Sequence, residues 1–136
     1  MDSALFLSAS DPRPMYQQIV DQISARVLAG DWLPGQALPS IRELAAASQV
    51  SVITVKRAYE ELERAGLILT RQGKGSVVAD QPEPARQRLE ASLLGHLQAA
   101  ISDAERLGLD SEQLQQRLTD ALDAHPRLRP HTGAPS

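Results

Sequence analysis

Hydrophobic residues recur at the spacing of an α-helix in five stretches of this 136-residue chain. The first stretch runs from Tyr16 to Val27. Pro14 precedes it, and proline suits the first turn of a helix because its missing N–H has no partner there. Gly30 follows it, and glycine commonly ends a helix. The pattern therefore predicts a first helix between Pro14 and Gly30 with one apolar face.

Two short helices are predicted next, with only a few residues between them. Ser40 and Glu43 have the spacing of a capping box at the start of one, and Ser51 is placed to cap the other. The apolar face of the second short helix consists of Val55, Ala58, Tyr59 and Leu62. Short helices joined so briefly must cross at a steep angle, which is the geometry of a helix-turn-helix.

Two short strands are predicted at residues 67–70 and 76–79, on either side of a glycine-containing turn over 71–75. A hairpin that follows a helix-turn-helix completes a winged helix-turn-helix. Domains with a helix-turn-helix commonly place their second short helix in the major groove of DNA. The pattern therefore points to nucleic-acid binding before any single side chain is considered.

The remaining chain predicts two further helices. Residues 81–84, Gln-Pro-Glu-Pro, have the composition of a linker. A long helix then ends at Gly108, and Asp110 is placed to cap the last helix. The apolar residues of the long helix cover an arc of about 140°, which is wide for a helix that packs on a single neighbour.

We expect a second copy of the chain to cover this apolar face, because a large exposed apolar patch marks an interaction site. The predicted dimer contacts are Leu89, Leu93, Leu94, Leu97, Ile101, Ala104, Leu118 and Leu122. The alternative is that the face packs entirely on the first helix of the same chain.

The predicted fold class is mainly α with a small β-hairpin, an N-terminal winged helix-turn-helix followed by a two-helix C-terminal dimerisation element. The predicted organisation is a flexible arm over 1–13, a winged helix-turn-helix DNA-binding domain over 14–79, a linker over 80–85, a helical dimerisation element over 86–124 and a disordered tail over 125–136.

The net charge of −3 counts against DNA binding until the charges are located. Residues 11–79 contain eight Lys and Arg against seven Asp and Glu, whereas residues 80–136 contain six against nine. The acid is therefore concentrated in the C-terminal part. A modest basic patch is predicted near the reading surface, and it consists of Lys56, Arg57, Arg71 and Lys74.

Other classes of protein find little support in the composition. Cysteine is absent, which excludes disulfides and thiolate metal sites. The three histidines, His96, His125 and His131, have no ligand partners at useful spacing. We find no set of residues for catalysis, so we expect no enzyme, no cofactor and no metal. No stretch approaches the roughly 20 apolar residues that span a bilayer, and no secretory signal is evident, so a cytoplasmic protein is expected.

A combination of short motifs now carries a family resemblance. The motif residues are Gly30, Leu33-Pro34-Gly35, Leu38-Pro39-Ser40, Arg42-Glu43-Leu44-Ala45, Ser51, Thr54-Val55, Arg57-Ala58-Tyr59, Leu62, Gly66-Leu67 and Gly73-Lys74-Gly75. From Pro14 to about Ala79 the chain resembles the GntR family of bacterial transcriptional regulators. Its short C-terminal part resembles the YtrA-type subfamily, whose C-terminal helices dimerise and whose members often repress neighbouring transporter operons.

The resemblance implies which residues contact DNA. The contacts carried over to this sequence are Ser40, Arg42, Ser51, Val52, Ile53, Thr54, Lys56, Arg57, Gln72, Gly73, Lys74 and Gly75. Many family members have Arg and a polar residue directly after the capping Ser, whereas this chain has Val52 and Ile53. The chain therefore lacks an Arg that could read guanine there. We hypothesise that Ile53 contacts thymine methyl groups.

Some of these residues have simpler interpretations. Arg57 has Glu61 four residues later and could pair with it. Ser40 and Ser51 are first of all helix caps, and Lys74 could be a solvated turn residue. A single exposed isoleucine such as Ile53 is common on protein surfaces.

The predicted function is sequence-specific binding of double-stranded DNA by a homodimeric repressor at palindromic operators, and the resemblance implies a transporter operon as the target. Two symmetric copies would read half-sites about one helical turn, or about 10 base pairs, apart. The sequence specifies no small-molecule effector. The alternative is a winged-helix adaptor that binds proteins and does not read DNA, and the acidic balance of the chain favours it slightly.

Overall fold

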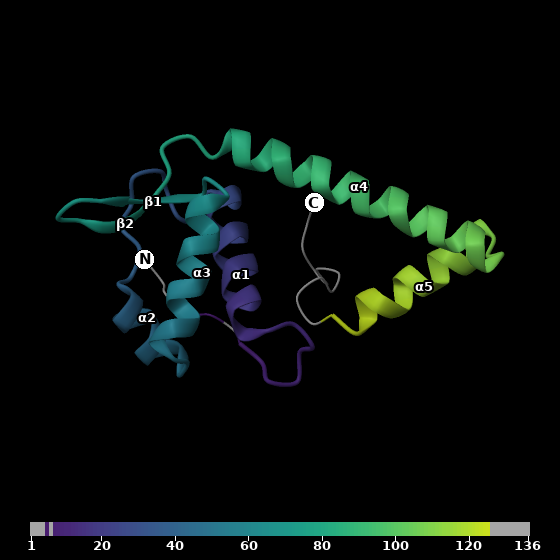
Figure 1. Ribbon diagram of the computed structural model, residues 1–136, viewed down its shortest axis with the longest axis horizontal. Helices are drawn as coiled ribbons and strands as arrows, with labels where there is room; N and C mark the ends of the chain where they lie inside the picture. Colours follow the sequence, from purple (N-terminus) through teal and green to yellow (C-terminus); the bar gives the residue numbers. More distant parts are fainter. Residues whose placement is uncertain (1–4, 6, 126–136) are drawn as a thin grey trace, which may run out of the picture. The chain divides into compact units, whose positions relative to one another are not determined.

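The computed structural model describes residues 5 and 7–125, which form five helices and one two-stranded sheet (Figure 1). The elements are α1 (Met15–Ala29), α2 (Ile41–Ser48), α3 (Val52–Arg64), β1 (Ile68–Arg71), β2 (Gly75–Val78), α4 (Glu83–Leu107) and α5 (Ser111–Asp123). The chain divides into two compact units, one up to Leu89 and one from Glu90 onward. The predicted fold class, mainly α with a small hairpin after a helix-turn-helix, is confirmed.

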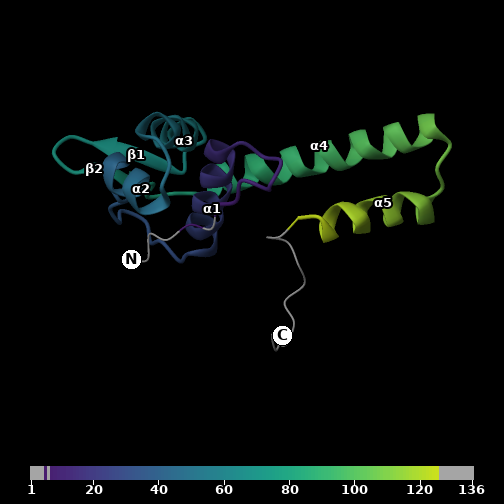
Figure 2. The ribbon, with the colours of Figure 1, turned by 90° about the horizontal axis from the view of Figure 1, so that it is seen from below.

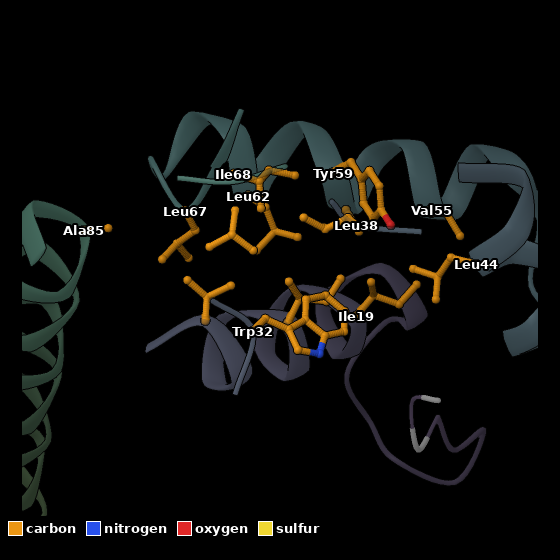
Figure 3. Packing of buried hydrophobic residues seen from close by; sticks show 14 of the residues in the cluster. Ile19, Trp32, Leu38, Leu44, Val55, Tyr59, Leu62, Leu67, Ile68 and Ala85 are labelled. Atoms are coloured by element: carbon orange, nitrogen blue, oxygen red, sulfur yellow. The ribbon is translucent and has the colours of Figure 1, made fainter. Parts of the chain in front are cut away.

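The core of the N-terminal unit is built on α3. Helices α1 and α2 both pack against it, and Figure 3 shows side chains of α1 and α3 facing each other across the interior. The fully buried apolar side chains include Ile19 and Ile23 of α1, Leu44 of α2, and Val55, Ala58 and Leu62 of α3. The apolar stripe of each predicted helix is therefore its core side.

The helix ends have local causes that the sequence predicted. The Ser40 hydroxyl accepts a hydrogen bond from the Glu43 amide at 3.0 Å, and the Glu43 carboxylate accepts one from the Ser40 amide at 3.2 Å. Ser51 caps α3 by accepting from the Thr54 amide at 3.1 Å. Gly30 ends α1 in the left-handed region at φ 83°. Gln49 adopts φ 58° at the end of α2, which glycine or asparagine adopts with less strain.

The hairpin differs from its predicted bounds by one residue. β1 pairs with β2 antiparallel from Ile68 opposite Val78 to Arg71 opposite Gly75, whereas we expected strands at 67–70 and 76–79. The ladder extends one residue further toward the tip because Gly75, at φ 70°, pairs with Arg71. The turn is correspondingly shorter, and the Lys74 amide donates to the Arg71 carbonyl oxygen at 3.0 Å.

A preceding segment is hydrogen-bonded to the other edge of β2. The Leu38 amide donates to the Ser76 carbonyl oxygen at 2.9 Å, and the Val78 amide donates to the Gln36 carbonyl oxygen at 2.8 Å. This segment leads directly into α2. The base of the hairpin and the start of α2 are therefore tied together by backbone hydrogen bonds.

The described part of the N-terminal arm, which we expected to be flexible, contacts α1. Leu5 and Leu7 pack against the core. The buried side-chain amide of Gln18 accepts from the Ser8 amide and donates to the Ser8 carbonyl oxygen, both at 2.9 Å. These paired hydrogen bonds satisfy a buried polar group and fix this part of the arm beside α1.

Helix α4 begins at Glu83, inside the range 80–85 that we expected to be a linker. Glutamate and proline suit the first turn of a helix, and Ala85 is buried in the core of the N-terminal unit. Arg86 donates to the Leu28 carbonyl oxygen, near the end of α1. Arg88 donates to the Ala65 carbonyl oxygen at the end of α3, at 2.6 Å. The first turns of α4 are thus part of the N-terminal unit.

The C-terminal unit consists of the rest of α4 and α5, which folds back after Gly108 (Figure 2). Asp110 and Gln113 form the predicted capping box, with the Asp110 carboxylate accepting from the Gln113 amide at 2.8 Å. The predicted tail lies outside the described residues, apart from His125. Among the described residues, no helix is both long and apolar enough to cross a membrane.

The apolar residues of this unit are mostly exposed. Ala104 is buried at the turn between the two helices, whereas α5 has no buried residue. The exposed side chains include Leu89 at 44%, Leu93 at 59%, Leu94 at 56%, Leu97 at 44%, Ile101 at 52%, Leu118 at 50% and Leu122 at 38%.

Candidate nucleic-acid interface

The outer side of α3 presents the residues expected to read DNA. Its inner side is held in the core, so the first two turns expose Val52, Ile53, Lys56 and Arg57 to solvent. Ile53 is 79% exposed, the highest value among the large apolar side chains in the described part of the chain. Thr54 is half-buried at the edge of this side. A helix with this surface can enter the major groove without unfolding any of the core.

The start of α2 and the hairpin come together beside α3. Both Ser40 and Arg42 are exposed at the first turn of α2. They line one groove together with Tyr59 of α3 and with Gly75 at the base of the wing. The structure therefore brings residues from three expected contact segments to one face of the N-terminal unit.

The wing tip is fully accessible. Gln72, Gly73, Lys74 and Gly75 are all exposed, and neither glycine has another atom within 4 Å of where a Cβ would lie. Both glycines have positive φ, 79° and 70°, which L-residues adopt only with strain. Arg71, which we counted in the basic patch, instead pairs with Asp80 at 2.9 Å. Of the two cations that we expected at the wing, Lys74 is therefore the one without an ion pair among the described residues.

The two capping hydroxyls are already engaged. Ser40 and Ser51 each accept a backbone N–H, and the hydroxyls of Ser51 and Thr54 lie 2.8 Å apart. This agrees with the interpretation that both serines are primarily caps. The Ser40 O–H can still donate to a phosphate, and so can one of the Ser51 and Thr54 O–H groups, since only one of these two donates in the bond between them.

Arg57 has a partner that we did not expect. Its guanidinium carbon lies 3.7 Å from the centre of the Tyr16 ring, on α1. Glu61, the expected partner four residues later, pairs with Arg64 at 2.6 Å. Sequence reasoning placed Tyr16 only in the apolar stripe of the first helix. An aromatic residue at the edge of such a stripe was the available signal, but it does not identify which cation will stack on it.

Tyr59 is buried beside the same groove. Its hydroxyl donates to the Pro39 carbonyl oxygen at 2.7 Å. Burial, and secondarily the negative charge of Glu43, raise the pKa of Tyr59 well above its ordinary value. The phenol therefore stays protonated over the physiological range and acts as a donor that positions the backbone before α2.

Within residues 5 and 7–125, no group of three or more His, Cys, Asp or Glu side chains could hold a metal ion. Of the three histidines, His96 is exposed on α4, and His131 lies outside the described residues.

Comparisons with known proteins agree with this geometry. A family model described as bacterial regulatory proteins, gntR family, matches residues 15–78. The HTH-type transcriptional repressor YtrA of Bacillus subtilis is 36% identical over 110 residues, which cover 78% of this chain and 85% of YtrA. The HTH-type transcriptional regulator YhcF of the same organism is 35% identical over 102 residues, which cover 75% of this chain and 84% of YhcF.

Solved structures of similar proteins extend the likeness to the fold. A transcriptional regulator from Oenococcus oeni has a TM-score of 0.64 and 29% identity, covering 85% of this chain and 97% of that one. The GntR-family transcription factor YtrA from Sulfolobus acidocaldarius has a TM-score of 0.59 and 26% identity, covering 89% of this chain and 98% of that one.

The similarity to B. subtilis YtrA and YhcF extends beyond the winged helix-turn-helix, since more than four fifths of each relative is covered. This chain therefore resembles family members of similar length along most of their sequence. The chain belongs to the gntR family of bacterial regulatory proteins, and it is a DNA-binding transcriptional regulator of the YtrA type rather than an enzyme.

Proposed function

We propose that this protein is a homodimeric repressor that binds a palindromic operator through the outer side of α3, the start of α2 and the wing. The observation that carries the proposal is that the three segments expose their expected contact residues, apart from the half-buried Thr54, while their other sides are held in one core. The similar protein YtrA of B. subtilis is named a transcriptional repressor, which supports the direction of regulation.

Different residues supply affinity and sequence preference. Arg42, Lys56, Arg57 and Lys74 are exposed cations that neutralise backbone phosphates. Ile53 and its neighbour Val52, which is 46% exposed, form an apolar tip where the helix enters the groove. An apolar tip favours thymine, whose methyl group lies in the major groove. We therefore expect an operator whose contacted positions are rich in A·T pairs.

Dimerisation follows from the apolar face of α4 and α5. Eight exposed leucine and isoleucine side chains on these helices need cover in water, and seven of them are predicted dimer contacts. A second copy supplies a matching surface, because a twofold interface joins the same patch on both subunits. Two reading helices related by this axis would contact half-sites about 10 base pairs apart, and the resulting operator is a palindrome.

Repression then arises by occlusion, since a dimer on a promoter excludes the polymerase. The resemblance to YtrA-type regulators leads us to propose a transporter operon as the target, in the bacterial cytoplasm where the chromosome lies.

The second candidate is a winged-helix adaptor that binds another protein. The acidic balance favours it, since the net charge is −3 and α3 also carries the exposed Glu60 and Glu63. A DNA-binding protein and an adaptor differ in their response to salt, because phosphate contacts release counterions.

The test is an anisotropy titration of the full-length protein against a labelled duplex from its own promoter, from 50 to 300 mM KCl. We expect the logarithm of the association constant to fall linearly with the logarithm of the salt concentration, with a slope of about −0.9 for each phosphate contact. The variant Lys56→Gln should show a shallower slope. Absence of DNA binding at every salt concentration would favour the adaptor.

A further inference from the structure

The stacked pair of Tyr16 and Arg57 lies at the edge of the exposed side of α3. The guanidinium carbon of Arg57 lies over the Tyr16 ring, 3.7 Å from its centre, which is a cation–π contact. Tyr16 is half-buried and packs against the core, so its ring has a fixed position. Arg57 is exposed apart from this contact, and the ring therefore restrains the position of its guanidinium group.

Stacking uses the face of the guanidinium and leaves its edge free. An arginine carries five N–H donors, all in the plane of the group. Among the described residues, no carboxylate forms an ion pair with Arg57, because Glu61 is engaged by Arg64 at 2.6 Å. The guanidinium group of Arg57 therefore has a restrained position and N–H donors that remain available.

The residues around Arg57 indicate what its guanidinium group would bind. Arg57 lines a shallow depression with Ile53 and Lys56, residues of the expected reading surface, and with Glu60 and Glu61. Two adjacent cations on the exposed side of a helix that enters a groove can each contact a phosphate of the DNA backbone that borders the groove. The carboxylates of Glu60 and Glu61 in the same lining repel phosphate, so we expect an anion to bind beside Arg57 and Lys56.

We propose that Tyr16 is a positioning residue for DNA binding: its ring holds Arg57 so that the guanidinium edge donates to a backbone phosphate beside the major groove. This inference rests on the proposed function, since it names a further part of the same DNA interface. Tyr16 itself touches no DNA. Its contribution is that less side-chain freedom is lost when Arg57 meets the phosphate, in contrast to Lys56, which has no such support.

The test combines four variants in the full-length protein with salt titrations on one duplex. Arg57→Gln should lower affinity and reduce the salt slope by about 0.9 for each bound protomer, because one phosphate contact is lost. Tyr16→Leu should lower affinity by about threefold, the size of an exposed cation–π contact. Tyr16→Phe keeps a ring and should bind like the wild type. Arg106→Gln, which removes an exposed arginine of α4 that belongs to neither the expected DNA contacts nor the predicted dimer contacts, should leave the slope unchanged.

The double variant with both Tyr16→Leu and Arg57→Gln distinguishes a role of Tyr16 in positioning Arg57 from a role in stabilising the fold. We expect it to bind DNA as Arg57→Gln does, because Tyr16 acts only through Arg57. Thermal unfolding of each variant shows how much folded protein is present. The proposal is overturned if Arg57→Gln retains the wild-type slope, or if Tyr16→Leu lowers the melting temperature without changing the affinity of the folded protein. Failure of the wild type to bind any DNA would instead overturn the proposed function and this inference with it.

Discussion

The phenolic O–H of Tyr59 donates a hydrogen bond to the carbonyl oxygen of Pro39, 2.7 Å away. Pro39 directly precedes Ser40, the cap of α2, and Tyr59 lies on the core side of α3 with 5% of its surface exposed. The bond therefore joins the two helices of the helix-turn-helix where α2 begins. It fixes the position of Ser40 and Arg42 relative to the reading helix.

Removal of this bond should destabilise the protein. We expect Tyr59→Phe to lower the free energy of unfolding by about 1 kcal/mol, the usual net contribution of one hydrogen bond. Urea unfolding followed by circular dichroism measures the change. Tyr16→Phe is the matched control, since it removes a tyrosine hydroxyl that has no hydrogen bond to any of the described residues. Equal stability of Tyr59→Phe and the wild type would contradict the role of this bond.

The same tyrosine should make stability depend on alkaline pH. Burial raises the pKa of Tyr59 in the folded protein, so the folded state keeps a proton that the unfolded state loses above about pH 10. The corresponding stability is fully present below pH 10 and is lost as the pH rises above it. Urea midpoints between pH 8 and 11 should therefore fall more steeply for the wild type than for Tyr59→Phe. Parallel curves would show that Tyr59 has an ordinary pKa.

The end of α2 carries strain that glycine would relieve. Gln49 adopts φ 58°, in a region that L-residues enter at a cost. Gln49→Gly should raise the free energy of unfolding by about 0.5 kcal/mol, because the relief exceeds the extra backbone entropy that glycine loses on folding. Gln49→Val should lower it, since a β-branched residue tolerates positive φ least. A less stable glycine variant would contradict this account.

Base preference should depend on Ile53. On a duplex that contains the natural site, replacement of contacted thymines by uracil removes only the methyl groups. We expect the wild type to lose about fivefold in affinity on the uracil duplex, because an apolar contact to a methyl group is lost. Ile53→Ala should bind both duplexes equally. If the variant discriminates between them as strongly as the wild type, Ile53 does not read thymine methyl groups.

The apolar face of α4 should be required for dimerisation. Leu97 is 44% exposed near the middle of this face, and Leu97→Asp would bury an unpaired charge in a dimer interface. We expect sedimentation to show monomers with reduced operator affinity. Leu33→Asp is the matched control, because Leu33 is 61% exposed in a loop outside the predicted interface. A dimer that survives Leu97→Asp would refute the proposed interface.

The features that the sequence predicted correctly have local causes. Ser40 and Glu43 form their capping box because the two partners lie within one helical turn. Gly30 and Gly108 end their helices because each adopts positive φ. These relationships need no knowledge of the rest of the fold.

The features that were missed depend on packing between distant segments. The pairing of Arg57 with Glu61 was wrong, because once α1 lies against α3 the ring of Tyr16 is the partner of Arg57 and Glu61 pairs with Arg64. The contact of Arg57 with DNA stays a prediction. Similarly, Pro84 indicated a linker, but the burial of Ala85 extends α4 to Glu83. The contact residues proposed for DNA lie on the expected face, and their roles await the variants described above.

The most direct test of the central claim is selection of genomic fragments by the purified full-length protein, including its own promoter region, at two salt concentrations. A homodimeric repressor should enrich one palindromic site with half-sites about 10 base pairs apart. Recovery of that site should decrease steeply at the higher salt concentration. Recovery of no enriched sequence at either salt concentration would contradict sequence-specific DNA binding and favour the adaptor.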